Sequence, residues 1–135
     1  MQDIPINWLA LIAAAAIHFV VGALWYSPIL FVRQFQSLTG TTDADMKSAM
    51  PKGVVLGAVT SLVMAFVLVH AVKYAGAKSI PEGMMVGFFN WLGFIATVQL
   101  GAVLWAKQSM KLYAITVGAE LVSLLLMGGL LAAWP

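Results

Sequence analysis

Cysteine is absent from the 135 residues of this chain, and charged side chains are scarce. Without a thiol, the chain cannot form disulfides, thiolate metal sites, iron–sulfur clusters or a cysteine nucleophile. Charged residues make up 9% of the sequence, whereas a soluble domain has about 25%. So few charges cannot coat a water-soluble surface, which excludes a soluble enzyme. The net charge of +2 comes without a dense basic stripe, so we expect no nucleic-acid partner.

Hydrophobic residues make up 62% of the sequence and gather in four long runs. A hydrocarbon core about 30 Å thick is crossed by roughly 20 helical residues. Backbone in lipid must be hydrogen-bonded within its own element, so such runs form helices. The sequence therefore predicts an all-α fold: a four-transmembrane-helix bundle forming a single integral membrane domain over residues 1–135. The predicted spans are residues 8–27, 53–72, 83–106 and 112–134.

The first run could be mistaken for the apolar core of a signal peptide. A signal peptide carries basic residues before its apolar core. Here Asp3 precedes the run, and the first basic residue is Arg33. We therefore expect the first run to be a retained span.

Basic residues in the short loops predict the orientation of the chain. The loop between spans 3 and 4 and the loop between spans 1 and 2 lie on the same side, and together they hold five Lys or Arg. The opposite side holds Lys73 and Lys78. Because cytoplasmic loops carry the excess of basic residues, both termini are expected on the outer face. The five residues are Arg33, Lys47, Lys52, Lys107 and Lys111.

The segment between spans 1 and 2, residues 28–52, is the longest piece outside the predicted spans. Apolar residues of its first half surround Arg33, which predicts a short interfacial helix. Thr42 followed by Asp45 has the spacing of a helix N-cap, and we expect a short helix that Pro51 ends or kinks. A plain connector without further role is the alternative interpretation.

Polar side chains inside the spans fall at similar depths. At about 1.5 Å per residue, His18 and Glu120 each lie roughly 15 Å from the outer end of their spans. A carboxylate at that depth must face the bundle, find a partner or take up a proton. We therefore predict a contact between His18 and Glu120. Four further residues complete the predicted midplane polar centre: Thr60, Ser61, Thr97 and Gln99.

Small residues recur at helical spacing and predict close helix packing. Glycines four residues apart occur on span 2 and again on span 3, at Gly53, Gly57, Gly83 and Gly87. Glycine leaves room for the backbone of a neighbouring helix. We interpret these positions as packing sites between helices.

Sequence motifs of enzymes and metal sites are missing. The chain has no His-Glu-x-x-His, no Gly-x-Ser-x-Gly and no P-loop, so we expect a non-enzymatic protein without a bound metal. His18 and His70 differ in predicted depth by roughly 12 Å, too far for two axial ligands of one haem. No cofactor is expected.

Several segments together resemble a known family. Trp25–Pro28 reads Trp-Tyr-Ser-Pro, and Trp91–Phe94 reads Trp-Leu-Gly-Phe. With Asn7-Trp8, Leu38-Thr39-Gly40, Gly83, Gly87 and the closing run from Leu124 to Trp134, they make the chain resemble a bacterial membrane family, domain of unknown function 1761. The resemblance covers nearly the whole chain. It implies four helices in one small domain and carries no established activity, cofactor or catalytic residue.

Two functional hypotheses follow from these features. In the first, the chain acts by helix association in the lipid bilayer, as a homo-oligomer or as an accessory subunit of another membrane protein, because its small-residue faces favour close packing. In the second, it is a proton-linked carrier or channel for a small solute. His18 and Glu120 would then be the titrating centre, with Asn90 and Gln99 as orienting groups. The polar layer could equally be hydrogen bonding that fixes helix register.

Overall fold

The computed structural model describes residues 3–135, and every regular element in that range is a helix. Four helices are long and apolar enough to cross a membrane, and a short helix follows the first of them, which confirms the predicted all-α fold. Residues 80–105 form one continuous helix interrupted by a π-helical turn. The elements are α1 (Trp8–Trp25), α2 (Val32–Thr39), α3 (Asp43–Tyr74), α4 (Ile80–Trp91), η1 (Leu92–Ala96), α5 (Thr97–Trp105) and α6 (Met110–Ala133).

Side-chain caps fix where the helices begin. Thr42 and Asp45 form the predicted N-cap as a full capping box, in which each side chain bonds the backbone N–H of the other residue. Ser79 and Glu82 do the same at the start of α4. These bonds satisfy backbone donors that lack a partner inside the helix. At its other end, α2 terminates at Gly40, whose φ of 75° suits a residue without a side chain.

Pro51 does not end a helix, and the expected short helix before span 2 is wrong. α3 runs without a break from Asp43 to Tyr74 and includes Pro51. A proline in a helix interior costs about 3 kcal/mol, because it removes one backbone donor and crowds the preceding turn. The capping box at Thr42 and the packing of a 32-residue helix offset this local cost. α3 therefore begins ten residues before the predicted span at Gly53.

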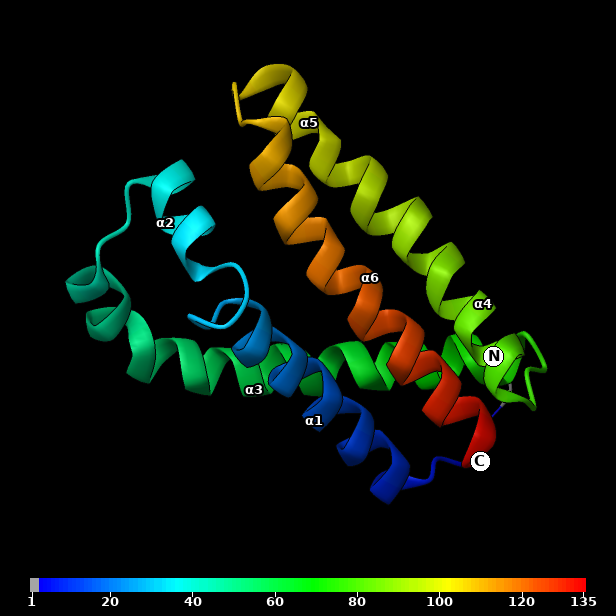
Figure 1. The fold of residues 1–135 in the computed structure, drawn as a ribbon. Helices are drawn as coiled ribbons and strands as arrows, with labels where there is room; N and C mark the ends of the chain where they lie inside the picture. Colours follow the sequence, from blue (N-terminus) through cyan, green and yellow to red (C-terminus); the bar gives the residue numbers. More distant parts are fainter. Residues whose placement is uncertain (1–2) are drawn as a thin grey trace.

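The core lies where α1, α3 and α6 meet. Ala14 of α1, Ala65 and Val72 of α3 and Met127 of α6 have no exposed surface. α6 contacts all three other long helices, and Figure 1 shows it running beside α4 and α5 with α1 on its other side. The start of α1 lies near the C-terminus (Figure 1), because the Asn7 side-chain amide donates to the carbonyl of Pro135 over 3.3 Å.

Glycines allow α4 to pack directly on the backbone of α6. Gly83 lies against Gly128, and a Cβ added to Gly83 would come within 2.6 Å of the Gly128 carbonyl carbon. Gly87 lies against the backbone of Leu124, where an added Cβ would come within 2.7 Å of the carbonyl carbon. The crossing of these helices therefore depends on the missing side chains.

Three hydrogen bonds from aromatic side chains also join α6 to the other long helices. The indole N–H of Trp25 donates to the carbonyl of Ile115, and that of Trp91 donates to the carbonyl of Val117, each over 2.8 Å. The hydroxyl of Tyr113 donates to the carbonyl of Ala96 over 2.6 Å. By contrast, α5 has no buried residue, so the second half of the third long helix packs loosely on the rest.

Candidate functional site: a histidine–glutamate pair at the end of a cavity

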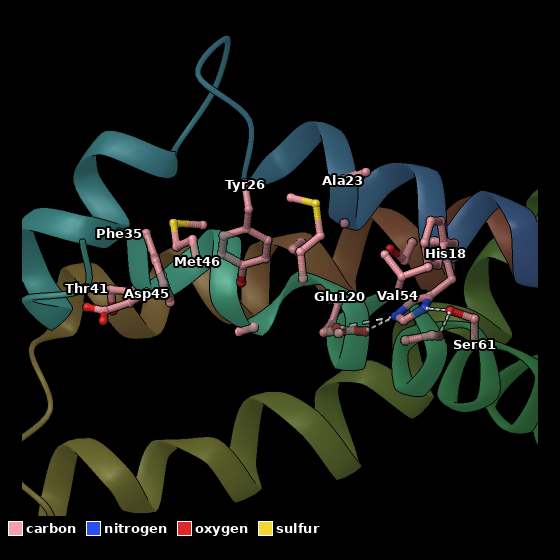
Figure 2. Close-up of a pocket in the computed structure, with 18 residues that line it drawn as sticks. His18, Ala23, Tyr26, Phe35, Thr41, Asp45, Met46, Val54, Ser61 and Glu120 are labelled. Atoms are coloured by element: carbon pink, nitrogen blue, oxygen red, sulfur yellow. Dashed lines mark hydrogen bonds and ion pairs between the residues drawn. The ribbon is translucent and has the colours of Figure 1, made fainter. Parts of the chain in front are cut away.

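Three helices bring His18, Ser61 and Glu120 together near the middle of their lengths. The contact predicted between His18 and Glu120 is present, with 3.1 Å between Nε2 of His18 and a carboxyl oxygen of Glu120. On the other side of the ring, Nδ1 of His18 lies 2.6 Å from the hydroxyl oxygen of Ser61. Figure 2 shows the imidazole held between these two partners. A single ring thus links α1, α3 and α6.

Ser61 determines which ring nitrogen carries a hydrogen. Its hydroxyl has one hydrogen and donates it to the carbonyl of Gly57, one turn earlier on α3, over 2.7 Å. The hydroxyl oxygen then faces Nδ1 of His18 as an acceptor, so we assign the hydrogen to Nδ1. This leaves Nε2 of His18 and the carboxyl group of Glu120 to share whatever proton lies between them.

One proton between Nε2 and the carboxyl group makes the pair electrically neutral. It either resides on Glu120, which then donates to Nε2, or resides on Nε2, which then donates to a carboxylate. Adding or removing one proton leaves a net charge in a site enclosed by apolar helices. The contact can therefore hold one proton between a carboxyl group and an imidazole in either of these two forms.

The pair forms the inner end of a cavity of about 690 Å³. The cavity extends along α1 from His18 to Tyr26, a rise of about 12 Å. Its other end lies between α2 and the first turns of α3, beside Phe35, Thr41 and Asp45 (Figure 2). The side chains of His18 and Glu120 are 15% and 28% exposed, so a molecule in the cavity can reach both. The chain thus presents a titratable pair to an open, mostly apolar space.

The charges lining the cavity have one sign. Asp45 and Glu120 are its carboxyl groups, and no Lys or Arg lines it. Asp45 lies in the first turn of α3, two turns before the apolar stretch that begins at Gly53. The backbone N–H of Thr42 and then its side chain hold the pKa of Asp45 below its usual value. The outer part of the cavity therefore carries a carboxylate at neutral pH.

On the opposite side of the pair, the helices are closely packed. Towards the chain termini, α1 contributes Ala10, Leu11 and Ala14, each at most 4% exposed. Val69 and Met127 fill the same region from α3 and α6. The cavity is consequently open towards α2 and closed towards the termini.

Three residues predicted for the polar centre do not join it. The structure exposes Thr60, Thr97 and Gln99 instead of placing them beside His18. The hydroxyl groups of Thr60 and Thr97 donate to carbonyls of their own helices, at Gly57 and Gly93. Neighbouring residues on a helix point about 100° apart, so Ser61 faces inwards and Thr60 does not.

The third span consequently contributes no side chain to the pair, and neither predicted orienting residue lies beside it. The side-chain amide of Asn90 donates to the carbonyl of Val86 on its own helix, and Gln99 is exposed. α4 packs mainly on α6 through its glycine face, on the far side from the cavity lining. The polar centre belongs to α1, α3 and α6 alone.

The glycines predicted for packing have different surroundings. Gly83 and Gly87 pack on α6, as described above. A Cβ on Gly57 would meet the ring of Phe19 at 3.5 Å, an ordinary contact between α1 and α3. Gly53 has no atom within 4 Å of an added Cβ and borders the cavity instead. The partner glycine on α6, Gly128, was not among the predicted packing sites.

Sequence reasoning also missed the wall of the cavity. Tyr26 and Phe35 come from different elements and pack edge to face, with 5.2 Å between ring centroids. Met46 and Met50 line the same space from the first turns of α3. The capping signal at Thr42 located the start of this helix, but no sequence signal placed it beside α1.

Metal and haem ligation gain no support from the geometry. Among residues 3–135, no group of three or more His, Asp or Glu side chains lies close enough together to hold a metal ion. His70 belongs to a separate region of α3, where Nδ1 lies 2.7 Å from the carbonyl of Phe66.

The fold defines a helical protein with four helices of membrane-spanning length and a half-buried polar pair among three of them. The family model described as protein of unknown function (DUF1761) matches residues 9–132. The chain belongs to that family. Neither the curated proteins nor the solved structures include a match to this chain.

Proposed function

We propose that this chain is a multi-pass membrane protein that acts as a proton-linked carrier for a small solute, with His18 and Glu120 as its titrating centre. The observation that carries the proposal is the cavity of about 690 Å³ that ends at this pair. A purely structural hydrogen bond between helices needs no access from outside, whereas both side chains here border open space. Ionisable groups at this depth in a membrane are costly and typically serve a function.

The packing around the pair supports a carrier in preference to a continuous channel. The cavity reaches the pair from the α2 side, and closely packed residues of α1, α3 and α6 separate the pair from the termini. A solute that entered would stop at the pair until the helices moved. This arrangement fits alternating access, in which a central site opens to one side at a time.

The basic residues support a proposed orientation of the chain across the membrane. The α2 side of the molecule carries Arg33, Lys47 and Lys52, the turn between α5 and α6 carries Lys107, and the first turn of α6 carries Lys111. Under the rule that cytoplasmic loops hold the excess of Lys and Arg, the cavity opens to the cytoplasm and both termini lie outside. Accessibility of single cysteines introduced at Ser37 and at Ala77 tests this orientation, because the native chain has no cysteine.

Proton flux into proteoliposomes tests the proposed function. With a pH-sensitive dye inside the vesicles and an imposed pH gradient, we expect the wild-type chain to move protons when a transported solute is present. Glu120→Gln and His18→Ala should each lower this flux at least about tenfold, since each removes one member of the pair. Flux that is unchanged in both variants would contradict the proposal.

Two matched substitutions serve as controls for the flux measurement. Glu82→Gln makes the same chemical change in the capping box of α4, and His70→Ala makes the same change on α3. Neither residue lines the cavity around the pair. Both variants should retain the wild-type flux, so a general effect of losing a carboxylate or an imidazole would be recognised.

Helix association is a second candidate function, and one observation favours it. α5 has no buried residue, and the amide of Gln99 is exposed on it. In a bilayer an exposed amide gains from a hydrogen-bonding partner on another helix. The glycine face of Gly83 and Gly87 no longer argues for a partner protein, because α6 already occupies it.

Mass measurement in native nanodiscs tests association. We expect the wild-type chain to form a homodimer, and we expect Gln99→Leu to weaken it. Thr60→Val, which removes an exposed polar group from α3, should leave the dimer intact. A strictly monomeric wild-type chain at high protein-to-lipid ratio would contradict this second candidate without affecting the carrier proposal.

A further inference from the structure

The cavity differs from a general apolar pocket in the sign of its charges. Asp45 stands at its outer end and Glu120 at its inner end, and no Lys or Arg lines the space between them. Arg33, Lys47 and Lys52 lie on the adjoining elements but are exposed and outside the lining. Asp45 is an exposed carboxylate at the mouth of the cavity, and Glu120 can ionise by giving up the proton that it shares with His18. With no Lys or Arg in the lining, the cavity favours a cation over an anion.

We propose that the cavity binds an organic cation with an apolar body, and that binding displaces one proton from the pair of His18 and Glu120. The inference rests on the proposed function and names its substrate class. It draws on two independent features of the cavity, the sign of its charges and the character of its walls.

The walls favour an apolar body around the charge. Phe19, Met50 and Val54 supply apolar surface next to the pair, and Tyr26 and Phe35 stand together further out. Aromatic faces attract cations, and methionine adapts to irregular apolar shapes. The volume of about 690 Å³ lies within the range of about 300–1,000 Å³ that is typical of pockets for organic ligands.

The same walls exclude a small inorganic cation. A divalent ion requires about six oxygen ligands, or the water that they replace. The lining offers few oxygen atoms apart from the two carboxyl groups, and these stand at opposite ends of the cavity, about 24 Å apart along α3 between the levels of Asp45 and Ser61. An organic cation needs no such shell of oxygen ligands, because its charge is spread over an apolar surface.

Charge balance at the pair connects binding to proton release. We take the pair to hold one shared proton before binding, which makes it neutral; the two atoms that share the proton lie 3.1 Å apart. A cation beside Glu120 would make the site positive unless that proton left for the solvent. After release, the ionised carboxyl group of Glu120 balances the ligand, and His18 is neutral with its hydrogen on Nδ1. Each cation bound therefore displaces one proton through the open end of the cavity.

Apart from His18 and Glu120, the cavity lining contains two titratable side chains. On α1 the phenol of Tyr26 lines the cavity, and on α3 the carboxyl group of Asp45 lines its outer end. α2 contributes Phe35 to the lining, and α6 contributes Glu120 as its one titratable side chain there. The proton exchange can therefore be assigned to His18 and Glu120.

Binding of tetraphenylphosphonium, measured by calorimetry on the full chain in mild detergent, tests the inference. This probe carries a permanent charge and cannot itself exchange a proton. We expect the wild-type chain to bind it and to ignore tetraphenylborate, an anion of the same shape, titrated separately. Glu120→Gln should weaken binding at least about tenfold, whereas Glu82→Gln should leave it unchanged. Asp45→Asn, at the outer end, should weaken it by a smaller factor.

The pH dependence separates cation binding from the proton exchange. Affinity of the wild-type chain should rise with pH, by up to about tenfold per unit, because protons compete with the cation. Equal binding of the cation and the anion, or undiminished binding by folded Glu120→Gln, would overturn the inference. Proton flux that depends on Glu120 without any cation binding would overturn only this inference and leave the carrier proposal standing. Cation binding without proton flux would contradict the carrier proposal and leave cation binding by the cavity standing.

Discussion

The two halves of α6 pack in opposite ways. Around Gly128 the helix lies against the backbone of α4, and the neighbouring Met127 has no exposed surface. Around Glu120 the same helix borders an open cavity, and the carboxyl side chain is 28% exposed. One half lacks side chains where two backbones meet, and the other half carries a polar side chain where space remains. The closest helix packing and the proposed proton-binding pair therefore lie in separate parts of one helix.

The largest expected effect comes from adding a single methyl group to the closely packed half. In Gly83→Ala the new Cβ would lie 2.6 Å from atoms of Gly128 and Ala132. Because neither helix backbone can move without disturbing its neighbours, we expect a loss of about 3 kcal/mol in the free energy of unfolding. Thermal or denaturant unfolding in detergent measures it.

Gly53→Ala is the matched control for this substitution. Its Cβ meets no atom within 4 Å. Replacing glycine by alanine inside a helix stabilises it by up to about 1 kcal/mol when nothing obstructs the methyl group. The two substitutions should therefore change stability in opposite directions. A Gly83→Ala variant as stable as Gly53→Ala would refute the backbone contact between α4 and α6.

A smaller effect is expected from Ser61→Ala, which changes a residue of α3 that lines the cavity. The substitution leaves Nδ1–H of His18 without its acceptor, and Ser61 is only 2% exposed. Losing this hydrogen bond should cost about 1–2 kcal/mol in stability. It should also slow proton flux several-fold, because the ring orientation is no longer fixed. Unfolding and dye-based flux measure the two effects.

The neighbouring Thr60→Ala provides the comparison for Ser61→Ala. Thr60 is exposed, and its hydroxyl donates to the carbonyl of Gly57 on its own helix. We expect no change in flux. Equal flux losses in the two variants would show that Ser61 acts through the helix rather than through His18.

The smallest expected effect concerns the link between α1 and α6 near the cavity. Trp25→Phe keeps an aromatic ring but removes the N–H that donates to Ile115. The loss should be about 1 kcal/mol in the free energy of unfolding. Trp105→Phe is the control, since Trp105 is 88% exposed. A Trp25→Phe variant with wild-type stability would remove this hydrogen bond from the account.

The sequence predicted one contact between spans correctly and rotational orientation poorly. Counting residues along each span placed His18 and Glu120 at one level, and the two side chains meet. The same counting placed Thr60 and Thr97 at that level, yet both face outwards. Apolar residues surround these helices on all sides, so periodicity does not reveal which face is buried. Depth follows from one helix, whereas orientation depends on its neighbours.

The structure also differs from the prediction at Pro51 and at the packing partner of Gly83, and both differences have physical causes. Pro51 was expected to end or kink a short helix, but the capping box before it and the long helix after it maintain the helix through it. The partner of Gly83 was not predicted, because packing between α4 and Gly128 depends on how two distant segments cross. Four spans could be predicted from composition, and the cavity could not, since α2 and the start of α3 form part of its wall.

The central claim is that Glu120 serves proton binding and contributes little to the fold. Measuring proton flux and melting temperature on the same proteoliposomes of Glu120→Gln tests it most directly. Glutamine keeps the size of the side chain and can still hydrogen-bond His18, but it cannot release a proton. The account predicts that flux falls at least about tenfold while the melting temperature stays close to that of the wild-type chain. Wild-type flux, or a loss of flux that only accompanies unfolding, would contradict it.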